Sequence, residues 1–198
     1  PGNDIEIFDR EFAISKFDLN NVLPNPAIFD TTKLLWMNGQ YIRNIEEDKF
    51  SKLALQKITT DITRDLFDSE LERLHKILPS VQERLETLND LTPQIKFLLD
   101  EPFIIDQTDW ENVNSEDGQQ YLFRIREKFK NLEKFSLENI ENLMREELKD
   151  MEIKPKVGFQ ITRVSITGTK ISPPLFESIY ALGKEGTIAR LAETIEKL

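Results

Sequence analysis

Two stretches of this sequence carry basic residues and no acidic ones, although the chain has a formal net charge of −10. The first is residues 31–43, which contains Lys33 and Arg43. Cations in such stretches bind phosphate groups by displacing condensed counterions, and net charge averages over faces that never meet a ligand. An acidic chain with two basic stretches is therefore compatible with a local, shape-specific contact to a nucleic acid. The second stretch is residues 153–176, and its cations are Lys154, Lys156, Arg163 and Lys170.

Other kinds of chemistry are restricted by composition. The 198 residues include no cysteine, which excludes disulfides, thiolate metal sites and a cysteine nucleophile, and favours a reducing cytoplasm. The single histidine, His75, argues against a histidine zinc site or a Ser-His-Asp triad, and we interpret it as a surface or packing residue. No apolar run approaches the roughly 18 residues of a membrane helix, and the first residues lack the layout of a signal peptide. We expect a cytoplasmic protein with no metal site and no membrane partner.

Most of the chain repeats apolar residues at helical spacing, which predicts an all-α fold. Asp30 is placed to cap a helix over residues 31–43, within which Asn38-Gly39 is a weak point. Ser136 is placed to cap another helix. The clearest apolar stripes are those of Leu71, Leu74, Leu78, Val81, Leu85 and Leu88, of Leu122, Ile125, Phe129 and Leu132, and of Ile188, Leu191, Ile195 and Leu198.

One segment conflicts with the helical pattern. Residues 159–169, FQITRVSITGT, are rich in β-branched side chains, and propensity alone predicts a strand. No partner strand is evident, and an isolated strand leaves its backbone groups unpaired, so the all-α prediction stands. In the following SPPLFESIYALG, Pro173 and Pro174 are expected in the first turn of a helix and Gly183 at its C-terminal cap.

Three stretches together resemble the C-terminal half of bacterial glutamyl-tRNA synthetases. They are residues 16–43, KFDLNNVLPNPAIFDTTKLLWMNGQYIR, residues 83–91, ERLETLNDL, and residues 156–185, KVGFQITRVSITGTKISPPLFESIYALGKE. The resemblance covers essentially the whole chain, but it includes neither a HIGH-like nor a KMSKS-like catalytic motif. It implies a tRNA-binding part of a class I synthetase that holds no cofactor itself and is inactive alone. ATP and magnesium would act in the catalytic part of the parent enzyme.

The resemblance also implies a division into three parts. A stem-contact segment would cover residues 1–45, and two helical anticodon-binding subdomains would follow at 46–106 and 107–198. Apolar periodicity lapses near residues 44–48 and 106–115, which agrees with those boundaries.

Within these parts, the resemblance assigns the sugar-phosphate contacts of a tRNA stem to Lys33, Asn38 and Arg43. The alternative is that Trp36 packs inward and Lys33 is merely solvated. Arg84 matches an arginine that faces the third anticodon base, and Arg145 matches one that faces the first. Arginine presents a rigid fork of donors that suits a base edge. Sequence alone would leave Arg84 as a surface residue paired with Glu83, Glu86 or Asp90.

The loop TGTKISPPLF is expected to bind unstacked anticodon bases, since proline-stiffened loops lose little entropy on binding. The alternative is a plain capping loop with Phe176 in the core. Pro174 stands where family members often have a small residue such as glycine, so one backbone donor is missing. The residues assigned to this site are Ile171, Ser172, Pro173, Pro174 and Phe176.

The expected partner is tRNA-Glu, bound by a monomer. A non-discriminating enzyme that also accepts tRNA-Gln is the near alternative. An acidic helical protein-interaction module is the alternative from another class, and steep salt dependence would separate it from a tRNA binder. We expect no DNA partner.

Overall fold

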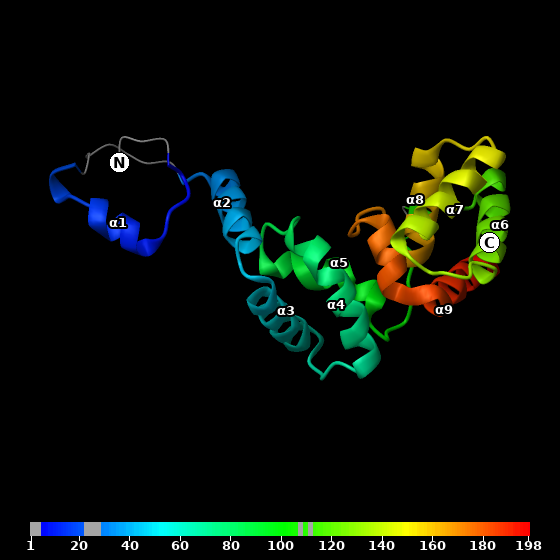
Figure 1. The fold of residues 1–198 in the computed structure, drawn as a ribbon, viewed down its shortest axis with the longest axis horizontal. Coiled ribbons are helices and arrows are strands. Elements are labelled where there is room, and N and C mark those ends of the chain that lie inside the picture. The colour runs from blue at the N-terminus through cyan, green and yellow to red at the C-terminus, as the bar shows by residue number, and fades with distance from the viewer. Residues whose placement is uncertain (1–4, 22–28, 107–108, 111–112) are drawn as a thin grey trace.

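The computed structural model describes residues 5–21, 29–106, 109–110 and 113–198, and within them every regular element is a helix (Figure 1). The all-α prediction is confirmed. Residues 159–169, for which propensity favoured a strand, lie largely in helix α8 (Pro155–Thr167). Helix α8 buries Ile161, Val164 and Ile166, so the β-branched residues form a helical packing face. No helix of the described part is long and apolar enough to cross a membrane.

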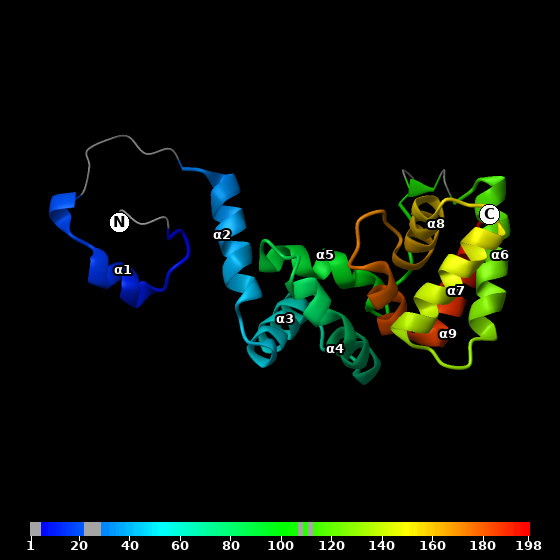
Figure 2. The same cartoon turned by 45° about the horizontal axis from the view of Figure 1, so that its top comes forward.

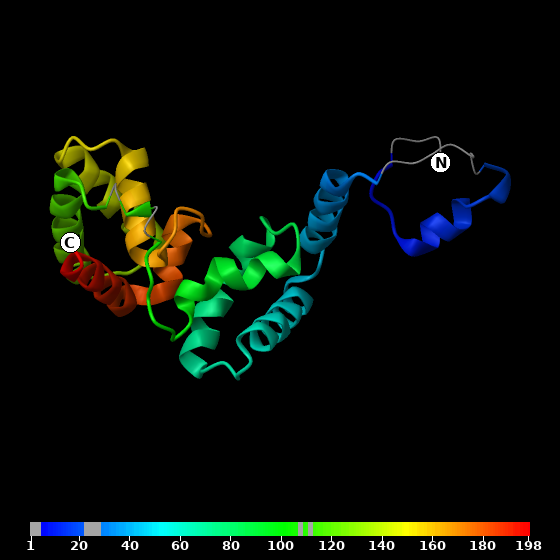
Figure 3. The ribbon, with the colours of Figure 1, turned by 180° about the vertical axis from the view of Figure 1, so that it is seen from behind.

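The N-terminal part contains three separate short elements: α1 (Arg10–Lys16), the 3-10 turn η1 (Leu19–Asn21) and α2 (Thr31–Arg43). Helix α1 has no buried residue, and it lies at the opposite end of the molecule from α6–α9 (Figures 1 and 3). The Asp30 carboxylate accepts from the Lys33 backbone N–H at 3.0 Å, which confirms the predicted cap of α2. Figure 2 shows α2 standing between α1 and the central helices.

The central part packs two long helices, α3 (Glu47–Ile62) and α4 (Asp68–Gln82), against the short elements that follow. Those elements are η2 (Leu88–Asp90), α5 (Leu91–Ile95) and η3 (Lys96–Leu98). Phe50, Ala54 and Ile58 of α3 are fully buried with Leu74 and Ile77 of α4.

The C-terminal part is a bundle of α6 (Glu116–Lys130), α7 (Leu137–Asp150), α8 and α9 (Leu175–Glu196). Ser136 caps α7 as predicted, since its hydroxyl accepts from the Asn139 N–H at 3.4 Å. Helix α9 packs against α6, α7 and α8, and also against α4 of the central part. Its first residue contradicts one prediction. Helix α9 begins at Leu175, so Pro173 and Pro174 precede the first turn rather than lie in it.

Gly183 interrupts α9 with φ 83° and ψ 166°, close to where the sequence predicted a helix end. The chain then re-enters a helical conformation at once. The first polar stretch, 44–48, follows the end of α2 at Arg43 and includes the start of α3 at Glu47, and the described residues of the second, 106–115, precede α6, although α9 packs across that second boundary onto α4. The division into parts 1–45, 46–106 and 107–198 stays a prediction.

Candidate nucleic-acid interface

Arg84 lies in a turn after α4, although the apolar stripe from Leu71 to Leu88 predicted a helix through this position. Helix α4 ends at Gln82, and the Arg84 backbone N–H donates to the Val81 carbonyl at 2.9 Å. The Gln82 side chain donates to the carbonyls of Ile42 at 2.9 Å and Ile45 at 2.8 Å, which ties the end of α4 to the end of α2. We call residues 83–86 the Arg84 turn.

The Arg84 side chain is exposed, and none of the expected acidic partners holds it. Within the described part of the chain, its guanidinium makes no hydrogen bond or ion pair with Glu83, Glu86 or Asp90. The Asp90 carboxylate instead accepts from the N–H and the hydroxyl of Thr87, both at 2.8 Å. The Arg84 donors are therefore available to a ligand.

The three residues assigned to a tRNA stem do not share one surface role in the structure: one pairs with a carboxylate, and the other two contact the Arg84 turn. Lys33 is exposed and its ammonium pairs with the Glu6 carboxylate at 2.5 Å, an interaction that raises the pKa of Lys33. Asn38 and Arg43 point toward the Arg84 turn, where they donate to the backbone carbonyls of residues 86 and 83 at 2.5 and 3.4 Å. Trp36, which the alternative interpretation buried, is 42% exposed.

Residues 169–174, here called the proline loop, are anchored from beneath by Arg163 of α8. One guanidinium nitrogen of Arg163 donates to the Ser172 hydroxyl, to the Ser172 carbonyl at 3.3 Å and to the Pro173 carbonyl at 2.7 Å. Burial lowers the pKa of Arg163, and the positive charge of nearby Arg84 lowers it further. Arg84 therefore lies near enough to Arg163, the anchor of the proline loop, for its charge to act there.

Two further contacts fix the start of the proline loop. The Asp109 carboxylate accepts from the Lys170 N–H at 2.5 Å and pairs with the Lys170 ammonium at 2.7 Å. Gly168 has φ 82°, and a Cβ there would lie 2.4 Å from the Ile104 carbonyl oxygen, so only glycine fits without strain. These contacts fix the position at which the loop leaves helix α8.

The five residues assigned to this loop differ in exposure. Ile171 is 85% exposed, whereas Pro173 is buried and cannot offer a stacking surface. Ser172 and Pro174 are half-buried, as is Phe176, which packs edge-on against Phe159 at 5.4 Å between ring centroids.

Arg145 of α7 reaches the same region through an aromatic contact. Its guanidinium lies 5.3 Å from the ring centroid of Phe159, the residue that packs against Phe176. The side chain also pairs with Glu141, at 2.7 Å from Nε and 2.6 Å from Nη2. Arg84 and Arg145 thus approach helix α8 from two different helical parts: the charge of Arg84 acts on Arg163, and the guanidinium of Arg145 contacts Phe159.

Sequence reasoning did not assign Arg163 and Phe159 to the site. Phe159 and Arg163 are four residues apart in α8, so a helical interpretation of this segment places them on one face, beneath the loop. The strand-like composition of residues 159–169 concealed that signal.

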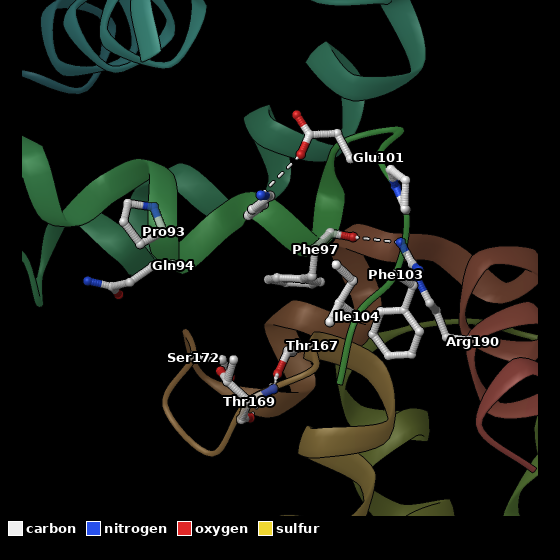
Figure 4. Close-up of a pocket in the computed structure, with 12 residues that line it drawn as sticks. Pro93, Gln94, Phe97, Glu101, Phe103, Ile104, Thr167, Thr169, Ser172 and Arg190 are labelled. Carbon is white, nitrogen blue, oxygen red and sulfur yellow. Dashed lines mark hydrogen bonds and ion pairs between the residues drawn. The ribbon is translucent and has the colours of Figure 1, made fainter. Parts of the chain in front are cut away.

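A small cavity of about 160 Å³ opens between the central part and the proline loop (Figure 4). Thr169 and Ser172 line its loop side, and Pro93, Gln94 and Phe97 line the side of the central part. Mixed apolar and hydrogen-bonding walls of this kind suit a flat, unstacked base. Among the described residues, no group of three His, Asp or Glu side chains is placed to hold a metal ion.

Comparison with known proteins gives concordant results. The sequence pattern of the family described as "anticodon binding domain" matches residues 49–195. The glutamate–tRNA ligase of Cutibacterium acnes is 34% identical, covering 96% of this chain and 39% of that protein. Glutamate–tRNA ligase 2 of Caldicellulosiruptor saccharolyticus is 31% identical, covering 100% of this chain and 41% of that protein. The chain thus spans about two fifths of the length of these relatives.

A solved structure has the same fold. The glutamate tRNA ligase from Elizabethkingia meningosepticum, in complex with its amino acid, superposes with a TM-score of 0.83 and covers 100% of this chain and 38% of its own. The identity is 24%, so this likeness concerns the fold alone.

Proposed function

We propose that this chain, which belongs to the anticodon-binding domain family, binds the anticodon stem-loop of tRNA-Glu as part of a glutamate–tRNA ligase. The observation that carries the proposal is the proline loop, which Arg163 anchors at the Ser172 and Pro173 carbonyls, with Arg145 in contact with Phe159 of the same helix α8. A rigid loop loses little entropy on binding. Unstacked bases are recognised by stacking and by donors to their edges, which Ile171, Phe176 and the two arginines assigned to anticodon bases provide.

Arg84 is the proposed reader of the last anticodon base. That base is C in tRNA-Glu, and cytosine offers acceptor atoms to an arginine fork on its pairing edge. Guanine, the last anticodon base of the major tRNA-Gln, presents donors there that an arginine leaves unpaired. Arg145 would read the first base after releasing Glu141.

Lys33 is the proposed contact to a stem phosphate, for which it must exchange its exposed pair with Glu6. Phosphate contacts position a protein on its nucleic acid without reading sequence. Asn38 and Arg43 hold the Arg84 turn, and we assign them to its positioning rather than to the stem. In the intact protein, a separate catalytic part would attach glutamate with ATP and magnesium.

Arg84→Gln is expected to narrow the preference for C over G at the last anticodon position. A bidentate base contact is worth roughly 1–3 kcal/mol, or about 5- to 150-fold. Glutamine both donates and accepts, so G should become better tolerated. The measurement is a set of binding titrations with tRNA-Glu, tRNA-Gln, and tRNA-Glu whose last anticodon base is changed to G.

The matched control is Arg10→Gln, the same change at an exposed arginine of α1. It should lower affinity for all three tRNAs alike, or not at all. Equal binding of the three tRNAs by the unmodified chain would refute a reading role for Arg84 and favour a non-discriminating enzyme.

A further inference from the structure

The end of α2 and the Arg84 turn are tied together in both directions. The Asn38 amide donates to the Glu86 carbonyl at 2.5 Å, and Arg43 donates to the Glu83 carbonyl at 3.4 Å. In return, the buried Gln82 amide donates to the carbonyl of Ile42 in the last turn of α2, at 2.9 Å, and to that of Ile45 just after the helix, at 2.8 Å. Side chains from each segment thus donate to backbone carbonyls of the other segment, some 40 positions away in the sequence.

Gly39 allows this close approach. It is buried in the middle of α2, and a Cβ there would lie 3.0 Å from the Leu85 carbonyl oxygen. That distance is tighter than most real Cβ contacts, so alanine would require the turn to shift by a few tenths of an ångström. Glycine and asparagine weaken a helix interior, and the contact with the turn gives a physical reason for both residues here.

We propose that Asn38 and Gly39 are specificity-determining residues for the last anticodon base, although neither touches it, because they position the turn that carries Arg84. Asn38 and Arg43 hold the carbonyls on either side of Arg84 in the chain. A base-reading fork must be placed within about half an ångström to hold its geometry, and a loose turn would lose that placement. The inference rests on the proposed role of Arg84.

Helix α2 links the proposed stem contact to the Arg84 turn. Lys33, the proposed phosphate contact, and Asn38 lie on one continuous helix. The hydrogen bonds of Asn38 and Arg43 join that helix to the Arg84 turn. A tRNA stem seated on α2 would therefore set the position of Arg84 as well.

The first test compares Asn38→Ala and Gly39→Ala with the control Gln56→Ala, which removes an exposed amide from helix α3. Binding titrations would use tRNA-Glu and the same tRNA with G as its last anticodon base. Both variants should lose at least about fivefold of the preference for C, a part of the discrimination that a bidentate contact provides. The control should keep it. Alanine favours a helix over glycine, so a lower preference in Gly39→Ala cannot be ascribed to a weaker α2.

The second test needs no RNA. Hydrogen exchange of the Arg84 and Thr87 amides, which are hydrogen-bonded to the Val81 carbonyl and the Asp90 carboxylate, reports the order of the turn. These amides should exchange about tenfold faster in Asn38→Ala and in Asn38→Asp, which keeps the size but loses the donor, a difference equivalent to about 1.4 kcal/mol.

The two tests separate the possible failures. Unchanged exchange and an unchanged preference in all the variants would overturn the positioning role while leaving the proposed function intact. An unmodified chain without any preference for C would overturn the proposed function of Arg84, and the inference with it.

Discussion

Replacing Glu70 with alanine is expected to lower the free energy of unfolding by about 3–5 kcal/mol, the usual cost of breaking a buried ion pair. The Glu70 carboxylate is fully buried and accepts hydrogen bonds from the two terminal nitrogens of the Arg64 guanidinium, at 2.8 and 2.6 Å. It also accepts hydrogen bonds from the backbone N–H groups of Phe67, at 2.9 Å, and of Asp100, at 2.7 Å. Alanine would leave four donors without their acceptor. Urea denaturation followed by circular dichroism measures the change.

The matched control is Glu72→Ala on the same helix. Glu72 pairs with Lys76 one helical turn away in solvent, and such pairs contribute less than about 1 kcal/mol. Similar destabilisation by the two substitutions would contradict the role given to Glu70.

The same carboxylate gives the chain a defined acid sensitivity. The hydrogen bonds from Arg64, aided by those from the Asp100 and Phe67 backbone, lower the pKa of Glu70 from 4.5 to about 2. A group whose pKa is depressed on folding stabilises the folded state above its unfolded pKa. Its contribution, about 3 kcal/mol, is therefore lost as the pH falls from about 4.5 to about 2. Glu70→Gln should flatten this part of the stability profile.

Arg163→Ala is expected to weaken binding of tRNA-Glu by about 10- to 100-fold, equivalent to roughly 1.4–2.7 kcal/mol. The substitution removes the donor that holds the Ser172 and Pro173 carbonyls, so the proline loop must be ordered at the moment of binding. The measurement is a binding titration over a range of salt concentrations, with a thermal melt of each variant.

Lys156→Ala is the control, because it removes an exposed cation from the same basic stretch. Both substitutions delete one positive charge, and only Arg163→Ala loosens the loop. An equal loss of affinity in both variants, with an equal change in salt slope, would show that Arg163 acts only through its charge.

Features set by local chemistry were predictable from the sequence. Asp30 and Ser136 cap the helices expected of them, because a cap depends on residues only three positions away. The secondary structure of residues 159–169 could not be predicted from their local composition. Their propensity favoured a strand, but a strand without a partner has unpaired backbone groups, and α8 satisfies those groups internally. The hydroxyl of buried Thr162 is satisfied within the same helix, since it donates to the Gly158 carbonyl at 3.0 Å.

The site itself was only partly predictable. Arg84 and Arg145 were assigned by resemblance, and no periodicity could place them near helix α8. The end of α4 depends on Gln82 bonding to the carbonyl of Ile42, which is remote in sequence. Arg163 donates hydrogen bonds to backbone carbonyls that come within reach only when the chain has folded. Contacts of this kind leave no mark in residue type or spacing.

The central claim is that this chain recognises a tRNA by its anticodon loop. The most direct measurement titrates the chain with two RNA hairpins of equal length, the anticodon stem-loop and the acceptor stem of tRNA-Glu, at one salt concentration. The anticodon hairpin should bind at least about tenfold more tightly than the acceptor hairpin, a difference of about 1.4 kcal/mol. Changing the three anticodon bases should remove that advantage. Equal binding of the two hairpins, or an advantage that survives the change of anticodon, would contradict the claim.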